Sequence, residues 1–181
     1  MTESSRPRPT PGFPAVTLVP VLAFLGTLSG CPGAASASEA PACATGETAV
    51  VVLAKAHVLV LCEGGAERGR WNVALGSGGV DKRREGDART PLGRYSLGTP
   101  RPSAAFHRFI PVAYPTLSQA RAGRTGSAVG IHGPPRGFQH LGLASVAVDW
   151  TLGCIALPSD ADVDAVGAFV RENHAGLRVE P

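Results

Sequence analysis

The sequence predicts a mainly β domain with short helices and one longer helix near its C-terminal end. Its 181 residues include 23 glycines and 16 prolines, and only 17% are charged, a composition that favours short strands and many turns. Runs of β-branched residues bounded by turn residues recur from residue 49 onward. Apolar spacing typical of a helix is clear only near the C-terminal end. The length is sufficient for one domain with its own core.

The expected strands follow one another along the chain. Residues 49–53 are rich in valine, and a second apolar run at 57–62 follows the short connection Lys55-Ala56, so the two runs predict a hairpin. Residues 71–76 predict a third strand that ends in a glycine-rich turn. Four further strand candidates lie at 94–97, 106–112, 129–132 and 177–179.

The helix is predicted to begin after Ser159. This serine is a good N-cap, and Asp162 three residues later makes a variant of the capping box. Three valines between 163 and 170 share one helical face. Gly176 is expected to end the helix. Because acidic side chains in the first turn complement the helix dipole, we do not interpret them as catalytic residues or as metal ligands.

Residues 1–30 resemble a bacterial export signal. Arg6 and Arg8 give a basic start, and residues 16–28 form an apolar run that is too short for a membrane-spanning helix. The run ends in Leu-Ser-Gly-Cys at Cys31, which resembles the lipobox of bacterial lipoproteins. In signals of that kind, the cysteine is lipidated and becomes the first residue of the mature protein. We therefore expect a lipoprotein signal at 1–30 and a membrane anchor at Cys31.

Residues 31–46 predict a flexible linker between this anchor and a folded domain at 47–181. The linker is small and polar, rich in Ala, Ser and Pro. Ordinary signal cleavage after residues 35–37 is the alternative, and it would give a secreted periplasmic protein. Both readings place the domain in the cell envelope, on the periplasmic side. The formal charge of +3 is too small to indicate nucleic-acid binding.

Three cysteines remain when Cys31 is assigned to lipid. Cys43 and Cys62 can pair in an oxidising compartment, with a stabilisation on the order of 3 kcal/mol. Cys154 would then carry the free thiol. The alternative is that Cys62 is a buried strand residue with no disulfide, and the spacing does not separate the two.

Cys154 and His132 are the candidate nucleophile and base. Cys154 directly follows Gly153 at the start of an apolar run, and a thiolate is a strong nucleophile that needs a partner to form at neutral pH. The interval back to His132 is too long for one helix face and suits two strands joined by a loop. A zinc site formed with His140 is conceivable, but no CxxC or HExxH spacing supports it. His107 and His174 have simpler structural explanations.

Several segments resemble the catalytic domain of the L,D-transpeptidases, cysteine enzymes of peptidoglycan cross-linking. Their active-site signature resembles His132-Gly133 followed by Thr-Leu-Gly-Cys-Ile at 151–155. Similar stretches in that family match residues 85–95, which contain Gly-Asp-x-x-Thr-Pro-x-Gly, and also Gly76, Lys82 and Tyr114-Pro115. The resemblance extends over residues 47–181.

The resemblance implies a β-sandwich or barrel domain and a defined reaction. Cys154 would attack the peptide carbonyl between an L-centre and a D-centre of a peptidoglycan stem peptide, with His132 as general base and acid. Backbone N–H groups near Gly153 would hold the oxyanion. Neither a metal nor an organic cofactor is implied. Further oxyanion or substrate contacts are expected at Thr151, Gly133 and Tyr114, and Trp150 either stacks on substrate or packs in the domain.

Two positions depart from the pattern of the family. Leu152 stands where the signature usually has histidine, and Ala156 stands where arginine is frequent. We expect the Leu152 side chain to pack, and Ala156 removes a cation that could pair with a substrate carboxylate. Two alternatives therefore stay open: a carboxypeptidase or amidase with water as acceptor, and an inactive lipoprotein that binds the cell wall.

Overall fold

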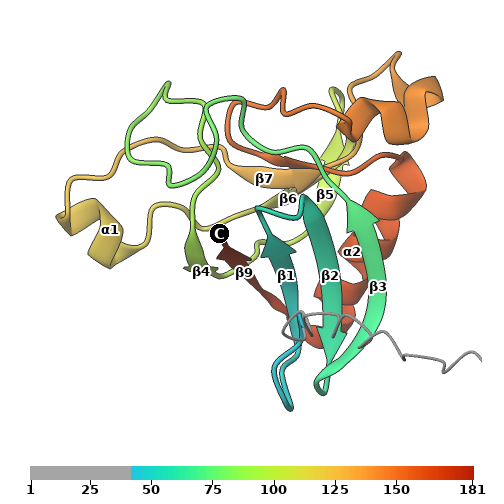
Figure 1. Ribbon diagram of the computed structural model, residues 1–181, viewed down its shortest axis with the longest axis horizontal. Coiled ribbons are helices and arrows are strands. Elements are labelled where there is room, and N and C mark those ends of the chain that lie inside the picture. The colour runs from blue at the N-terminus through green and yellow to red at the C-terminus, as the bar shows by residue number, and fades with distance from the viewer. Residues whose placement is uncertain (1–41) are drawn as a thin grey trace, which may run out of the picture. The chain divides into compact units, whose positions relative to one another are not determined.

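Two β-sheets and one long helix form the framework of the computed structural model, which describes residues 42–181 (Figure 1). The predicted signal, its alternative cleavage site and Cys31 lie outside the described residues. Within residues 42–181, no helix has the length and apolar character needed to cross a membrane. The mainly β fold class is confirmed.

The first sheet has five strands in the order β3-β2-β1-β9-β4. The predicted hairpin is present, since β1 and β2 pair antiparallel with Val51 opposite Val60. The C-terminal strand β9 runs parallel to β1 on its other side. The strands are β1 (Ala49–Leu53), β2 (Val58–Glu63), β3 (Ala66–Asn72), β4 (Gly93–Tyr95) and β9 (Gly176–Glu180).

The second sheet has four strands in the order β5-β6-β7-β8. Its last two strands run parallel, with Ile131 opposite Ile155 and His132 opposite Ala156. In this register Cys154, the residue just before β8, lies two positions before Ala156, the residue opposite His132. The strands are β5 (Arg101–Ser103), β6 (His107–Pro111), β7 (Gly130–His132) and β8 (Ile155–Ala156).

The third predicted strand is wrong in part. The strand β3 covers residues 66–72, a mostly exposed sequence at the edge of the first sheet. Residues 73–75 are fully buried and turn toward the second sheet, where Ala74 and Ala156 exchange backbone hydrogen bonds of 3.0 and 2.9 Å. The apolar run that predicted a strand therefore connects the two sheets.

The helix α2 (Asp160–Asn173) begins as predicted. Ser159 Oγ accepts the backbone N–H of Asp162 at 3.1 Å. The expected end at Gly176 is wrong, because His174 adopts the left-handed conformation with φ of 49° and Gly176 already begins β9. The sequence predicts short helices without their positions, and the structure has two short helical segments, α1 (Leu117–Arg121) and a 3₁₀ segment, η1 (Gln139–Val146).

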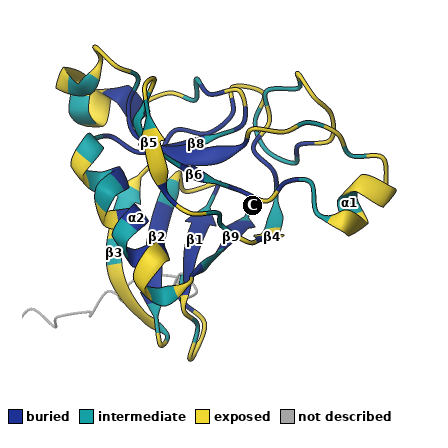
Figure 2. Cartoon of the chain, turned by 180° about the vertical axis from the view of Figure 1, so that it is seen from behind, coloured by how far each residue is buried: buried dark blue, intermediate teal, exposed yellow. Residues whose placement is uncertain are grey.

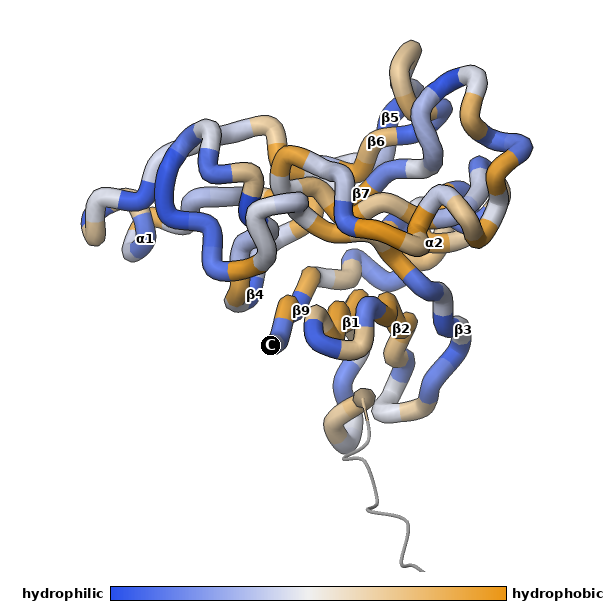
Figure 3. Tube along the Cα trace, turned by 45° about the horizontal axis from the view of Figure 1, so that its top comes forward, coloured by the Kyte–Doolittle hydropathy of each residue, from blue (hydrophilic) through white to orange (hydrophobic). Residues whose placement is uncertain are grey.

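The core lies between the two sheets and α2. It includes Val50, Leu59, Ile110, Ile131 and Val163, all with no exposed surface. Burying one such side chain contributes about 1.5–3 kcal/mol. Figure 2 shows that β1, β2 and β8 are largely buried, and Figure 3 shows hydrophobic residues along β1 and β2.

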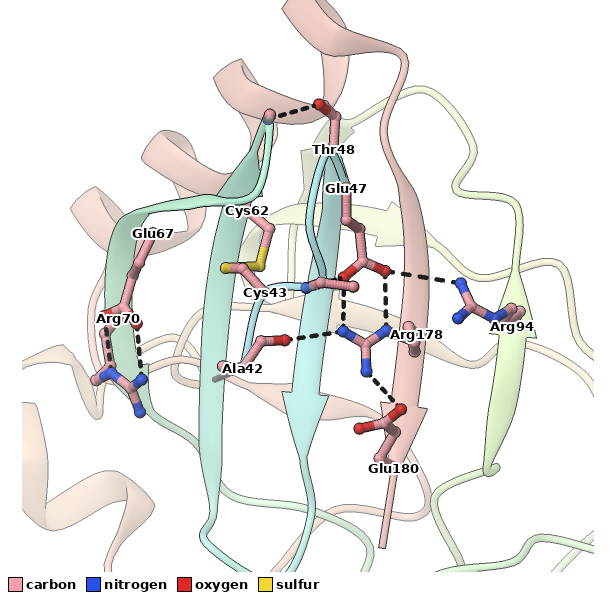
Figure 4. The surroundings of a disulfide bond; sticks show 12 residues. Ala42, Cys43, Glu47, Thr48, Cys62, Glu67, Arg70, Arg94, Arg178 and Glu180 are labelled. Carbon is pink, nitrogen blue, oxygen red and sulfur yellow. Dashed lines mark hydrogen bonds and ion pairs between the residues drawn. A yellow bond between two sulfur atoms is a disulfide. The ribbon is translucent and has the colours of Figure 1, made fainter. Parts of the chain in front are cut away.

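A disulfide joins Cys43 to Cys62 of β2, with a Cα–Cα distance of 5.4 Å (Figure 4). The guanidinium of Arg178 on β9 donates to both carboxylate oxygens of Glu47, at 2.9 and 2.6 Å, and to the carbonyl of Ala42 at 2.8 Å. This ion pair holds the pKa of Glu47 below its usual range. The last part of the expected linker is therefore held to the domain through Ala42 and Cys43.

Candidate active site

A cavity of about 520 Å³ lies beside β7 and the segment that leads into β8. His132 and Cys154 both line it, so the two residues that the sequence singled out share one site. Other side chains in its wall that bear on the chemistry are Lys82, Glu85, Phe106, Trp150, Thr151 and Leu152.

The imidazole of His132 is held in one orientation. It is 2% exposed and stacks on Phe106, with ring centroids 3.9 Å apart and planes at 21°. Its Nδ1 lies 2.7 Å from the carbonyl oxygen of Gly133. A carbonyl oxygen only accepts, so Nδ1 carries the proton and Nε2 keeps its lone pair. Burial lowers the pKa of His132, and the neutral form is therefore favoured near pH 7.

The thiol of Cys154 is half-buried, and its Sγ lies 3.6 Å from the carbonyl oxygen of Ala128. Burial raises the pKa of this thiol, while the backbone N–H of Gly130 and the ammonium of Lys82 act in the opposite direction. The balance favours a protonated thiol at rest. A thiol in that state needs a base to become a nucleophile, and the neutral imidazole of His132 is of the right kind.

The turn before Cys154 depends on Thr151 and Gly153. The hydroxyl of Thr151 donates to the carbonyl of Cys154 at 2.7 Å and accepts the N–H of Gly153 at 3.1 Å. Gly153 has a φ of 122°, and a Cβ there would lie 2.5 Å from the carbonyl oxygen of Arg89. Glycine is therefore required at this position.

This turn also identifies which N–H group is available for an oxyanion. The N–H of Gly153 is engaged by Thr151, whereas the N–H of Cys154 has no hydrogen-bond partner among residues 42–181. The expected oxyanion donors around Gly153 are therefore narrowed to the amide of Cys154 itself.

The other residues implied by the resemblance fall into two groups. Trp150 lines the cavity, with its ring 5.7 Å from His132, and its Nε1 donates to the carbonyl of Ser145 at 2.9 Å. Gly133 is not part of the cavity wall and reaches the site through its carbonyl. Tyr114 is 7% exposed, does not line the cavity, and donates its hydroxyl to the carbonyl of Lys82 at 3.0 Å. The structure thus gives Tyr114 a supporting place behind the cavity wall, in place of the expected substrate contact.

The two departures from the family pattern differ in exposure. Leu152 lines the cavity and is 82% exposed, so the expectation that it packs is wrong. The turn fixed by Thr151 directs this side chain outward. Ala156 has no exposed surface and pairs with Ala74 through the backbone. A cation at Ala156 would have to leave the core to reach substrate.

One feature of the cavity wall was missed by the sequence reasoning. Lys82 is 3% exposed, and its Nζ donates to Asp87 Oδ1 at 2.8 Å and to the carbonyl of Arg84 at 3.2 Å. The carboxylate of Asp87 also accepts three backbone N–H groups, which holds its pKa far below the usual range. The signal was present in the Gly-Asp-x-x-Thr-Pro-x-Gly run, but the run alone does not show which charge Asp87 would meet.

The other histidines, His57 among them, do not line the cavity. His140 does not line the cavity, His107 bonds to Asp164 at 2.9 Å, and His174 caps α2. No cluster of three or more His, Cys, Asp or Glu residues suited to a metal ion occurs among residues 42–181.

Comparisons with known proteins agree with this geometry. A family model described as the L,D-transpeptidase catalytic domain, YkuD, matches residues 46–177. No curated protein sequence matches the chain.

Among solved structures, the chain is similar to the helical cell shape determining protein Pgp2 from Campylobacter jejuni. The identity is 25% and the TM-score 0.60, over 72% of this chain and 46% of that one. It also shares a fold with Bd1075 from Bdellovibrio bacteriovorus, at 18% identity and a TM-score of 0.54, over 73% and 47% of the two chains. The chain therefore spans less than half the length of these two proteins.

Proposed function

Because the chain belongs to the L,D-transpeptidase catalytic domain family, we propose that it acts on peptidoglycan stem peptides through an acyl-enzyme formed on Cys154. The observation that carries the proposal is the parallel pairing of β7 with β8. This pairing places Cys154, just before β8, two positions from the residue opposite His132, and both residues line one cavity.

The first half of the reaction forms a thioester. His132 Nε2 takes the thiol proton as Sγ of Cys154 attacks the carbonyl carbon between the L- and D-centres, and the carbonyl oxygen gains the negative charge. The N–H of Cys154 is the group available to stabilise that charge. The C–N bond then breaks, and the departing D-amino acid takes the proton from His132.

The second half transfers the acyl group. An acceptor amine gives its proton to His132 Nε2 and attacks the thioester carbon, and the thiolate leaves and recovers the proton. The acceptor in a cross-linking reaction is an amine of a second stem peptide. Water in the same place would shorten the peptide instead, which is the alternative that the sequence left open.

Incubation of the purified full chain with disaccharide-tetrapeptide, followed by mass spectrometry, tests the proposal. We expect a cross-linked dimer that lacks one D-alanine. A shortened monomer alone would identify hydrolysis. Equal product from the wild type and from Cys154→Ala would show that Cys154 is not the nucleophile.

We also propose that residues 1–30 are a lipoprotein signal and that Cys31 anchors the protein to the membrane. The support comes from the sequence of the lipobox alone. Intact-mass analysis of the membrane fraction should show a lipid-modified chain that begins at Cys31. The variant Cys31→Ser should move the protein to the soluble fraction, and an unmodified wild-type chain would contradict the proposal.

A further inference from the structure

Lys82 is a buried cation in the wall of the cavity that Cys154 also lines. The sequence has only two lysines, Lys55 and Lys82, and Lys55 lies exposed in the turn between β1 and β2. Lys82 is 3% exposed, and buried ammonium groups occur in proteins almost only when they are paired. Asp87 and the carbonyl of Arg84 take two of its three donor positions.

The aliphatic part of Lys82 occupies a space that two glycines leave open. A Cβ on Gly126 would lie 3.0 Å from its Cε, and a Cβ on Gly153 would lie 3.8 Å from its Cδ. Gly153 directly precedes Cys154, so this side chain runs alongside the turn that carries the thiol. Lys82 is also the only lysine or arginine among the described residues that line the cavity.

We propose that Lys82 is a positioning residue for Cys154: held by Asp87, its ammonium keeps a positive charge beside the sulfur and stabilises the thiolate that forms when the thiol loses its proton. This role rests on the proposed function, in which Cys154 is the nucleophile. The charge stays in place because Asp87 is itself anchored by the backbone N–H groups of Arg83, Arg84 and Arg89.

Few other charged side chains of the described residues line the cavity beside Lys82. Among the described residues, Glu85 carries the only carboxylate in the cavity wall, and burial favours the neutral form of His132, on β7, by lowering its pKa. Asp87 is turned toward Lys82 and the backbone, and its negative charge is shared with four donors. Of the charged side chains around the site, Lys82 is the one that lowers the pKa of Cys154 against the effect of burial.

The test measures the reactivity of the Cys154 thiol and does not need a peptidoglycan substrate. The full chain is treated with iodoacetamide over a range of pH, and modification of the peptide that contains Cys154 is followed by mass spectrometry. Lys82→Met keeps the length of the side chain and removes the charge, and we expect the thiol pKa to rise by about one unit. A higher pKa leaves less thiolate at pH 7, but the thiolate that remains is more nucleophilic. The rate of alkylation at pH 7 should therefore fall only about three- to fourfold. The matched control Lys55→Met should alkylate like the wild type.

A second variant separates the effect of the Lys82 charge on the thiol pKa from the effect of its packing. Lys82→Met leaves the Asp87 carboxylate without its cation, so adding Asp87→Asn should bring the thiol pKa part of the way back. The thiol pKa should be lowest in the wild type, intermediate in the double variant and highest in Lys82→Met. A purely structural role predicts no such order. Because the double variant removes the ion pair as a unit, it also serves if Lys82→Met alone does not fold.

Two results would overturn the inference. One is a thiol pKa in folded Lys82→Met equal to that of the wild type, and the other is a double variant equal to the wild type. Failure of the proposed function looks different, because a wild type without activity on tetrapeptide would still show the shift in alkylation. Lys82→Arg, which keeps the positive charge, should retain most of the wild-type rate of Cys154 alkylation.

Discussion

Two buried ion pairs in this domain have similar bonding but face different surroundings. Glu47 and Arg178 meet at 2.6 Å with side chains about 10% exposed, and Lys82 and Asp87 meet at 2.8 Å with side chains less than 10% exposed. The first pair lies beside the Cys43–Cys62 disulfide and joins the start of the domain to its last strand (Figure 4). The second lies in the wall of the cavity that holds Cys154.

The surroundings of each ion pair determine whether its cation affects stability alone or also the reaction. Arg178 is surrounded by acceptors, since Glu47, Glu180 and the carbonyl of Ala42 all bind it, so its effect is confined to stability. Lys82 keeps one donor position free and borders a cavity with a titratable thiol. Changes in the cavity wall should therefore alter the reaction, and changes at the disulfide should alter stability alone.

Among the changes in the cavity wall, Gly153→Ala should have the largest effect on the reaction. A Cβ at this position meets the carbonyl of Arg89 at 2.5 Å and a φ of 122° disfavours any side chain. Displacement of Cys154 by a fraction of an ångström should lower kcat/KM about 100-fold. Turnover of disaccharide-tetrapeptide measures this. Gly123→Ala is the matched control, because Gly123 also has a positive φ of 79° but open space around it, and it should keep full activity.

The pH profile of kcat/KM should show its acid limb below the range usual for histidine, about pH 6.5. Burial lowers the pKa of His132, so the imidazole stays unprotonated, and able to act as a base, to more acidic pH. Below that pKa, activity should fall about tenfold per pH unit. An acid limb at or above pH 7 would show that another group is the base, or that His132 is not desolvated.

The double variant Cys43→Ala with Cys62→Ala should leave the reaction unchanged. Loss of the disulfide should lower the free energy of unfolding by about 2–5 kcal/mol. Denaturant unfolding measures the loss, and kcat on tetrapeptide is the control. A large fall in kcat of the folded variant would contradict the separation of the two regions.

Glu47→Gln should have the smallest effect, a loss of about 2 kcal/mol in the free energy of unfolding at pH 7. The pKa of Glu47 is lowered in the fold, so its stabilisation is complete above the ordinary value of about 4.3 and is lost as pH falls through the lower folded value. The wild type and the variant should therefore converge in stability in that acidic range. A difference that stays constant from pH 7 to pH 2 would show that the ion pair is not its source.

The sequence predicted the elements whose pattern is local. The hairpin of β1 and β2 follows from β-branched runs around a short turn, and the start of α2 follows from the capping residues at Ser159. The strand with His132 and the position of Cys154 came from short motifs and from the resemblance. These features depend on neighbours in the chain, so one sequence is enough to predict them.

The features that the sequence did not predict depend on distant contacts. Residues 73–75 read as the end of a strand, yet Ala74 pairs with Ala156, which lies far along the chain. The stacking of Phe106 on His132 and the burial of Lys82 arise in the same way, from segments that meet only in the fold. Leu152 shows the converse, since an apolar side chain that normally packs is directed outward by the turn that Thr151 and Gly153 require.

Trapping the acyl-enzyme tests the central claim most directly. The full chain is mixed with disaccharide-tetrapeptide, quenched in acid within the first turnover, and digested for mass spectrometry. We predict that the peptide containing Cys154 carries the stem peptide without its terminal D-alanine. Turnover with no adduct on Cys154, together with retained activity of Cys154→Ala, would contradict the account.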